Sequence, residues 1–262
     1  MTNPALTSIN MFVRAFFCIF VLLILSACEN TQKAPLALDS QKADLKKITE
    51  SLKQNGNVQS ATMIDQQIAG LDAKDEKSFL SLAESLQAAG KNPEAIGVLK
   101  TAHSLLPGSE PVKLKLAKAY VDSSEPAPAL KILEVVKNQQ TTEYYNLFGI
   151  AHDMQEKHLP AQEAYNKGLV IDGLDENLRN NLAMSYLLTD KTADAIKILE
   201  ELVKSPYTKT KNLPKYRQNL ALAYGISGKN DKAYKFLAKD LPQGQIQQNL
   251  GFYKAYRKQS VR

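Results

Sequence analysis

The sequence predicts an all-α protein built as an array of helical hairpins. Alanines recur at intervals of 34, 34, 32, 34 and 38 residues; they are Ala61, Ala95, Ala129, Ala161, Ala195 and Ala233. From the second hairpin on, a small residue also recurs on the first helix of each hairpin, and one more lies on the final helix. These residues are Ala83, Ala117, Gly149, Ala183, Ala221 and Gly251. Apolar residues repeat at i, i+3, i+4 and i+7, as one face of a helix requires. We expect two helices to cross closely wherever small residues of both meet.

The apolar residues place the helices in order along the chain. In the first helices of six hairpins they are Leu45, Ile48 and Leu52; Phe79, Leu82 and Leu86; Leu116 and Tyr120; Tyr145 and Phe148; Leu182 and Tyr186; and Leu220 and Tyr224. In the second helices they are Ile64 and Ile68; Leu99; Leu133 and Val136; Tyr165; Leu199 and Leu202; and Leu237. Leu250 and Phe252 indicate one further helix.

Turn residues support these boundaries. Gly90 and Gly228 fit positions just past a helix, where glycine adopts a positive φ at little cost. Asn92 fits the N-cap of the following helix and Pro93 its first turn. Ser123-Ser124-Glu125-Pro126 replaces the glycine turn in the third hairpin, so we expect that hairpin to be set differently.

The alanine period resembles the tetratricopeptide repeat, a 34-residue helical hairpin with small residues at fixed places. The resemblance covers residues 42–262, although the repeat's tryptophan is absent and its closing proline is clear only at Pro107. It implies a right-handed superhelical solenoid of about six hairpins plus a C-terminal helix. An irregular helical bundle is the alternative.

The first 27 residues predict a cleaved leader. Residues 15–25 are an unbroken apolar run, too short to span a membrane and typical of a signal peptide. Leu25-Ser26-Ala27-Cys28 resembles a bacterial lipobox, which implies cleavage between Ala27 and Cys28 and acylation of Cys28. An ordinary signal peptide followed by a cysteine is the alternative, and translation starts at Met1 or Met11.

Residues 28–41 are expected to be a lipidated N-terminus and flexible tether, because they are largely polar and contain Pro35. Several acyl chains on Cys28 give firm membrane anchoring. Glu29, rather than the aspartate of the inner-membrane retention signal, follows the cysteine and favours the outer membrane, with the protein facing the periplasm. The solenoid is expected to occupy residues 42–262.

The chain carries a formal charge of +6 without a block of consecutive basic residues, so a nucleic-acid partner is not expected. The longest alanine interval contains the inserted stretch 204–214, which is basic and bounded by prolines. Insertions in solenoids form loops and sometimes binding faces. Lys204, Lys209 and Lys211 are therefore either part of a solvated connector or contacts for an acidic partner.

No set of catalytic residues stands out, so we predict neither an enzyme nor a cofactor, metal or small-molecule substrate. The chain has no Gly-x-Ser-x-Gly elbow and no phosphate-binding Gly-Lys-Ser/Thr loop. His103, His152 and His158 lack the spacing of a zinc site. His152 occupies a packing position of the repeat, where a half-buried structural histidine is expected.

Asparagines recur just before the apolar pair of the first helices, as Asn181, Asn219 and Asn249, and Asn146 lies one place off this register. In the tetratricopeptide family an asparagine here faces the concave groove. Since an amide both donates and accepts hydrogen bonds, such a ladder can pair with the main chain of an extended peptide. The alternative is that asparagine is only a common polar residue at this place.

The C-terminal third carries a more specific resemblance. Arg217-Gln218-Asn219-Leu220-Ala221 leads to Asp240-Leu241-Pro242 and then to Asn249-Leu250. This string resembles the TadD lipoproteins of tight-adherence (Flp) pilus systems. The resemblance implies a pilotin-like protein that helps a secretin or another assembly component to localise. The alternatives are a pilotin or scaffold of a type IV pilus or type II secretion system, and a periplasmic scaffold for cell-wall enzymes.

Overall fold

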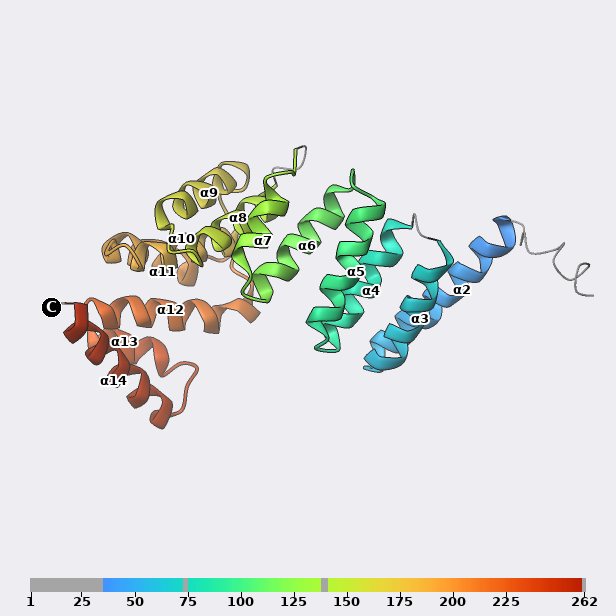
Figure 1. The fold of residues 1–262 in the computed structure, drawn as a ribbon. Coiled ribbons are helices and arrows are strands. Elements are labelled where there is room, and N and C mark those ends of the chain that lie inside the picture. Colours follow the sequence, from blue (N-terminus) through green and yellow to red (C-terminus); the bar gives the residue numbers. More distant parts are fainter. Residues whose placement is uncertain (1–34, 73–74, 138–140, 261–262) are drawn as a thin grey trace, which may run out of the picture. The chain divides into compact units, whose positions relative to one another are not determined.

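The computed structural model describes residues 35–72, 75–137 and 141–260, and within these ranges the regular structure is helical (Figure 1). The hairpins are α2 (Pro35–Gln54) with α3 (Val58–Leu71), α4 (Glu76–Ala88) with α5 (Asn92–Leu105), α6 (Glu110–Asp122) with α7 (Pro126–Leu133), α8 (Thr142–Asp153) with α9 (His158–Ile171), α10 (Glu176–Leu187) with α11 (Thr192–Lys204), and α12 (Leu213–Ile226) with α13 (Asn230–Leu237). A final helix, α14, spans Gln243–Ser260. The prediction of an all-α repeat of six hairpins and a C-terminal helix is confirmed.

The described helices form two compact units. Helices α2 and α3 pack on each other in the first unit, and the division falls between Leu71 and Asp72. In the second unit each helix from α4 to α13 packs on its hairpin partner, and neighbouring hairpins stack through both helices, as α5 on α6 and α4 on α6 do. The division coincides with a hydrophilic stretch of sequence at residues 72–77.

The predicted leader, the cleavage site at Ala27 and the acylated Cys28 lie outside the described residues. Residues 35–41 of the expected tether are helical, because α2 begins at Pro35. Proline suits the first turn of a helix, where its missing N–H has no intrahelical partner to lose, and Leu36, Ala37 and Leu38 then favour helix. No helix in the described ranges is both long enough and apolar enough to cross a membrane.

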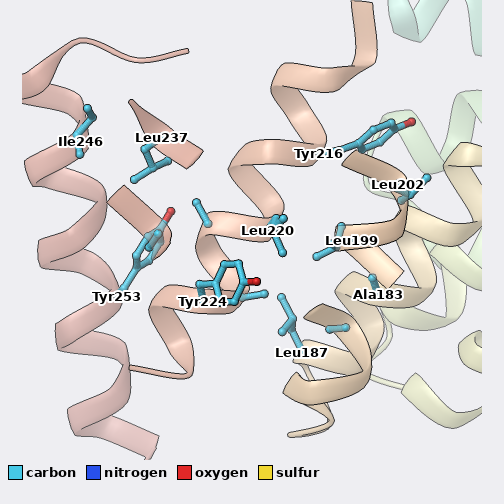
Figure 2. Packing of buried hydrophobic residues seen from close by; sticks show 14 residues of the cluster. Ala183, Leu187, Leu199, Leu202, Tyr216, Leu220, Tyr224, Leu237, Ile246 and Tyr253 are labelled. Carbon is cyan, nitrogen blue, oxygen red and sulfur yellow. The ribbon is translucent and has the colours of Figure 1, made fainter. Parts of the chain in front are cut away.

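The alanines of the second helices are all fully buried, as their spacing predicts. Ala183 and Ala195 belong to one apolar cluster together with Ala221 and Ala233, so small residues of both helices share the core of the fifth and sixth hairpins. Figure 2 shows Ala183 within this cluster. The prediction for Gly251 is wrong: it is exposed, and a Cβ there would meet nothing within 4 Å.

Polar N-caps start four of the first helices. The side chains of Asp75, Ser109, Thr141 and Asp175 each accept a hydrogen bond from the backbone N–H three residues later. These caps satisfy amide groups that the helix itself leaves unpaired. Asn92, expected to be an N-cap, is instead the first helical residue of α5, after Lys91.

The turns inside the hairpins share one backbone conformation. Gly90 and Gly228 have φ values of +74° and +83°, and Ser124 reaches +60° without being glycine. Ser124 N–H bonds to the carbonyl of Val121, and Glu125 N–H bonds to that of Tyr120, as Gly90 and Lys91 do at the end of α4. The third hairpin therefore turns in the same way as the glycine hairpins, and the expectation that it differs is wrong.

Candidate protein-binding groove

A hollow of about 500 Å³ runs across the first helices of four successive hairpins. Its lining comes from α6, α8, α10 and α12, together with Asp175 at the start of α10. Apolar side chains at its floor include Leu147 and Ile150, and its polar side chains include Asn146, Asn177 and Asn181. The repeat register thus brings residues more than thirty positions apart onto one surface, and Asn146 and Asn181 both lie on it; their binding of a peptide stays a prediction.

Four asparagine amides form a continuous chain of hydrogen bonds across α8, α10 and α12, which we call the amide chain. Asn219 Nδ2 donates to Asn180 Oδ1 at 2.7 Å, and Asn180 Nδ2 donates to Asn181 Oδ1 at 3.1 Å. Asn181 Nδ2 then donates to Asn146 Oδ1 at 2.8 Å. Asn180, which is buried, was not predicted, although the doubled asparagine at 180–181 was a visible signal.

The amide chain leaves hydrogen-bonding capacity for a ligand. A primary amide has two N–H donors and an oxygen with two lone pairs. Asn181 uses one donor and one lone pair within the chain, and its side chain remains partly exposed at the hollow. Asn249 does not join the chain, because its Nδ2 donates to the Gln245 carbonyl oxygen of its own helix at 2.9 Å.

Charged side chains of both signs surround the hollow. Lys118 Nζ and Asp122 form an ion pair at 2.9 Å on α6, and Lys215 Nζ lies 5.9 Å from the ring centre of Tyr216. Glu143 and Asp175 also line the hollow, and Asp175 is committed to the cap of α10. The mixture gives no strong field of one sign, so the charges favour neither a nucleic acid nor a highly charged ligand.

The inserted stretch before α12 is held against α10 by one carboxylate. Glu176 accepts hydrogen bonds from the Lys209 backbone N–H at 2.8 Å, from Asn212 Nδ2 at 2.8 Å and from the Tyr216 hydroxyl at 3.2 Å. Burial raises the pKa of the Glu176 carboxyl, but these hydrogen bonds outweigh burial and hold that pKa below its usual value. The insertion is therefore an anchored connector, which includes the short helix η1 (Thr210–Asn212).

The three lysines predicted in the basic loop do not act together. Lys204 Nζ pairs with Glu200 of its own helix at 2.9 Å. Lys209 and Lys211 have exposed side chains, and only the backbone of Lys209 takes part in anchoring the loop. Contact of these lysines with an acidic partner stays a prediction.

Replacing Glu176 should weaken the dependence of stability on acid. A carboxyl whose folded pKa is depressed stabilises the protein above its unfolded pKa, about 4.3, and loses that contribution as pH falls through the folded pKa. Between pH 6 and pH 3, the urea midpoint of Glu176→Gln should fall less than that of the unaltered chain. Glu163→Gln is the control, since that exposed carboxylate pairs only with Lys167 on its own helix; equal acid sensitivity in the Glu176→Gln and unaltered chains would contradict the assignment.

A largely buried polar network joins α8, α9 and α10, and no sequence motif marks it. Asp153 accepts hydrogen bonds from the Tyr165 hydroxyl at 3.0 Å and from the Ser185 hydroxyl at 2.8 Å, and its carboxylate lies 2.8 Å from His158 Nδ1. Burial, followed by the Asp153 charge and hydrogen bond, raises the pKa of Tyr165 far above its usual value. The three helices thus share one acceptor, which fixes their relative positions.

His152 packs against an aromatic ring of its own helix, whereas His158 pairs with Asp153. His152 lies edge-on to Phe148 with ring centres 4.6 Å apart, and burial, followed by the charge of Lys157, lowers its pKa. Among residues 35–72, 75–137 and 141–260 no three His, Cys, Asp or Glu side chains gather as a metal site would require. The tyrosines predicted to pack in repeat register do so: Tyr224 is buried, and Tyr120 and Tyr186 are partly buried against apolar clusters.

The segment from Arg217 to Leu250, which resembles the TadD lipoproteins, contains a bidentate ion pair. Arg217 Nε donates to Asp240 Oδ2 at 2.7 Å, and its Nη2 donates to Asp240 Oδ1. The pair connects α12 to the residues that follow α13, and Asp240 is largely shielded from solvent. Arg179 of α10 pairs with Glu201 of α11 through one nitrogen, so in each of these two hairpins an arginine joins the first helix to the second helix or to the residues just after it.

Comparisons with known proteins agree with this geometry. Two family models, both described as tetratricopeptide repeat, match residues 86–147 and 181–207. The comparison with curated protein sequences returned no match.

Several solved structures share the fold at low sequence identity. A tetratricopeptide repeat protein from Parabacteroides merdae is 14% identical with a TM-score of 0.66, over 87% of this chain and 89% of its own. PilF of Pseudomonas aeruginosa is 12% identical with a TM-score of 0.65, over 85% of this chain and 99% of its own. PilW, described as a widely conserved type IV pilus biogenesis factor, is 15% identical with a TM-score of 0.67, over 80% of this chain and 97% of its own. The chain thus has the fold of a helical-repeat solenoid of the tetratricopeptide type.

Proposed function

We propose that the chain is an outer-membrane lipoprotein that acts as an assembly scaffold for a tight-adherence (Flp) pilus secretion apparatus. In this proposal acylated Cys28 holds the protein in the inner leaflet of the outer membrane, facing the periplasm. The groove on the first helices binds a segment of the secretin and brings the secretin to that membrane. The assignment to the tight-adherence system depends on the resemblance of the segment from Arg217 to Leu250, and within it Arg217 and Asp240 form an ion pair.

The amide chain along the hollow is the observation that carries the proposal. An extended peptide repeats its backbone N–H and C=O groups along its length, and a row of amides offers matching acceptors and donors. Asn146 on α8 and Asn181 on α10 line the hollow, and Asn219 on α12 joins the same amide chain. A peptide running along the groove would therefore meet amides from the first helices of neighbouring hairpins. Leu147 and Ile150 supply apolar contact area beside it.

A second candidate is a scaffold for a type IV pilus or a type II secretion system. The similarity of fold to PilW, a type IV pilus biogenesis factor, favours it. The physical mechanism is the same and only the client differs. A scaffold for periplasmic cell-wall enzymes is a further alternative, and it predicts a different set of co-purifying proteins.

Replacing the lipid-bearing cysteine should separate binding from localisation. In Cys28→Ala the repeats should fold and bind their client, but the protein should leave the membrane fraction and the secretin should lose its outer-membrane location. Cys18→Ala, within the predicted leader, is the matched control and should behave like the unaltered protein. Membrane fractionation with quantification of the secretin measures both effects, and normal secretin localisation in Cys28→Ala would count against the mechanism.

A further inference from the structure

The last helix, α14, has one packed face and one open face. Ile246, Leu250, Tyr253 and Arg257 lie at helical spacing on the packed face. Ile246 and Tyr253 are buried there (Figure 2), and the Arg257 guanidinium donates to the carbonyl oxygen of Gly225. Gln248, Gly251, Phe252 and Ala255 also share a face, because they are spaced i, i+3, i+4 and i+7. All four are exposed, Phe252 by 60%. We call these four residues the end face.

The other hairpins reveal what kind of element covers such a face. Asn249-Leu250-Gly251 on α14 repeats the pattern Asn219-Leu220-Ala221 on α12. Ala221 is fully buried, and it belongs to one apolar cluster with Ala233 of the paired second helix. Gly225, four residues beyond Ala221, is covered by the ring of Tyr253 from α14 itself. In the same register Gly251 and Ala255 occupy the small-residue positions of a first helix, but both are exposed, and a Cβ on Gly251 would meet nothing within 4 Å.

The charges near the end face favour a partner helix that carries carboxylates. Helix α14 contains no acidic residue between Gln243 and Ser260, and Lys254, three residues from Gly251, has no carboxylate partner among the described residues. In the two preceding hairpins a carboxylate of the second helix, or of the residues just after it, pairs with the cation of the first helix, as Glu201 does with Arg179. A second copy of the chain would instead bring two basic helices together, which disfavours self-association.

We propose that the end face binds an amphipathic helix of a partner protein, with a small residue at the crossing and carboxylates beside Lys254. This helix packs on α14 as α13 packs on α12 and extends the array by one layer. The surface is separate from the groove of the first helices, so the two interactions fail independently.

The test uses the full chain and two synthetic peptides with the sequence of α11, Thr192–Lys204, whose alanine and leucines have the required spacing. In the acidic peptide Lys197 and Lys204 are replaced by glutamate; in the basic peptide Asp194, Glu200 and Glu201 are replaced by lysine. We expect fluorescence anisotropy to give a Kd for the acidic peptide that is lower by about tenfold or more. Equal binding of the two peptides, or binding of neither, would overturn the proposal.

Two variants locate the binding on α14. Gly251→Phe fills the crossing point and should weaken acidic-peptide binding by about tenfold or more. Gly251→Ala should bind like the unaltered chain, because alanine occupies the equivalent position 221. Gly97→Phe, at another exposed helical glycine with open space around it, should have no effect. Unchanged binding of the acidic peptide to Gly251→Phe would refute the site. If the purified chain forms a dimer that Gly251→Phe dissociates, the end face binds a second copy of the chain, and the proposal is also refuted.

Discussion

Gly149→Ala is expected to destabilise the second unit by about 2 kcal/mol, the net of an overpacking cost and a gain in helix propensity. A Cβ on Gly149 would lie 2.3 Å from Cε1 of Tyr165, whose side chain is almost fully buried. The tyrosine ring cannot yield freely, because its hydroxyl is held by Asp153. Either α8 and α9 move apart or the ring leaves its site and its hydrogen bond.

Gly97→Ala provides the matched comparison. Gly97 lies in the middle of α5, and a Cβ there meets nothing within 4 Å. With no clash, only the better helix propensity of alanine remains, and stability should rise by about 0.5–1 kcal/mol. Urea unfolding followed by circular dichroism measures both, and an equal rise in stability for Gly149→Ala and Gly97→Ala would show that the close crossing is not restrictive.

Asp153→Ala is expected to have a still larger effect, about 2–4 kcal/mol, because it leaves buried donors without an acceptor. The hydroxyls of Tyr165 and Ser185 both donate to this carboxylate, and both residues are almost fully buried. The loss also removes the contact with His158 at the start of α9. Three helices from two hairpins lose their shared acceptor at once.

Asp122→Ala is the control for Asp153→Ala. Asp122 pairs with Lys118 on the surface of α6, where both side chains are more than 40% exposed, and such pairs contribute about 0–1 kcal/mol. Thermal unfolding should therefore separate the two variants clearly. A Tm for Asp153→Ala equal to that of Asp122→Ala would mean that the network adds little to the stacking of α8, α9 and α10.

The repeat pattern predicts much of the fold because its physical cause is local and periodic. Alanine spacing reports where helices cross, and all six alanines are indeed buried. Gly251 departs from the pattern because it lies on a face of α14 that no helix among the described residues covers. Ser124 differs from the expectation for the third hairpin, because the backbone hydrogen bonds of the turn fix a positive φ there even though the residue is not glycine.

The candidate site was only partly predictable. Asn181 was singled out by the helix register and Asn146 as a residue one place off it, and the structure joins the two by a hydrogen bond. Asn180 was missed because its neighbour in sequence occupies the expected register position, and Asn249 turns back to its own helix. The Asp153 network joins residues up to 32 positions apart whose types are ordinary in a solenoid, so no local pattern marks it.

Binding of the secretin by the groove is the central claim, and capture from membranes tests it most directly. The unaltered chain, the double variant Asn181→Ala with Asn219→Ala, and the control Asn249→Ala are each purified from cross-linked membranes, and the captured proteins are identified by mass spectrometry. Circular dichroism establishes first that each variant is folded. We predict that the secretin is captured by the unaltered chain and by Asn249→Ala, and that a folded double variant loses most of it. Equal capture of the secretin by the folded double variant would contradict the account.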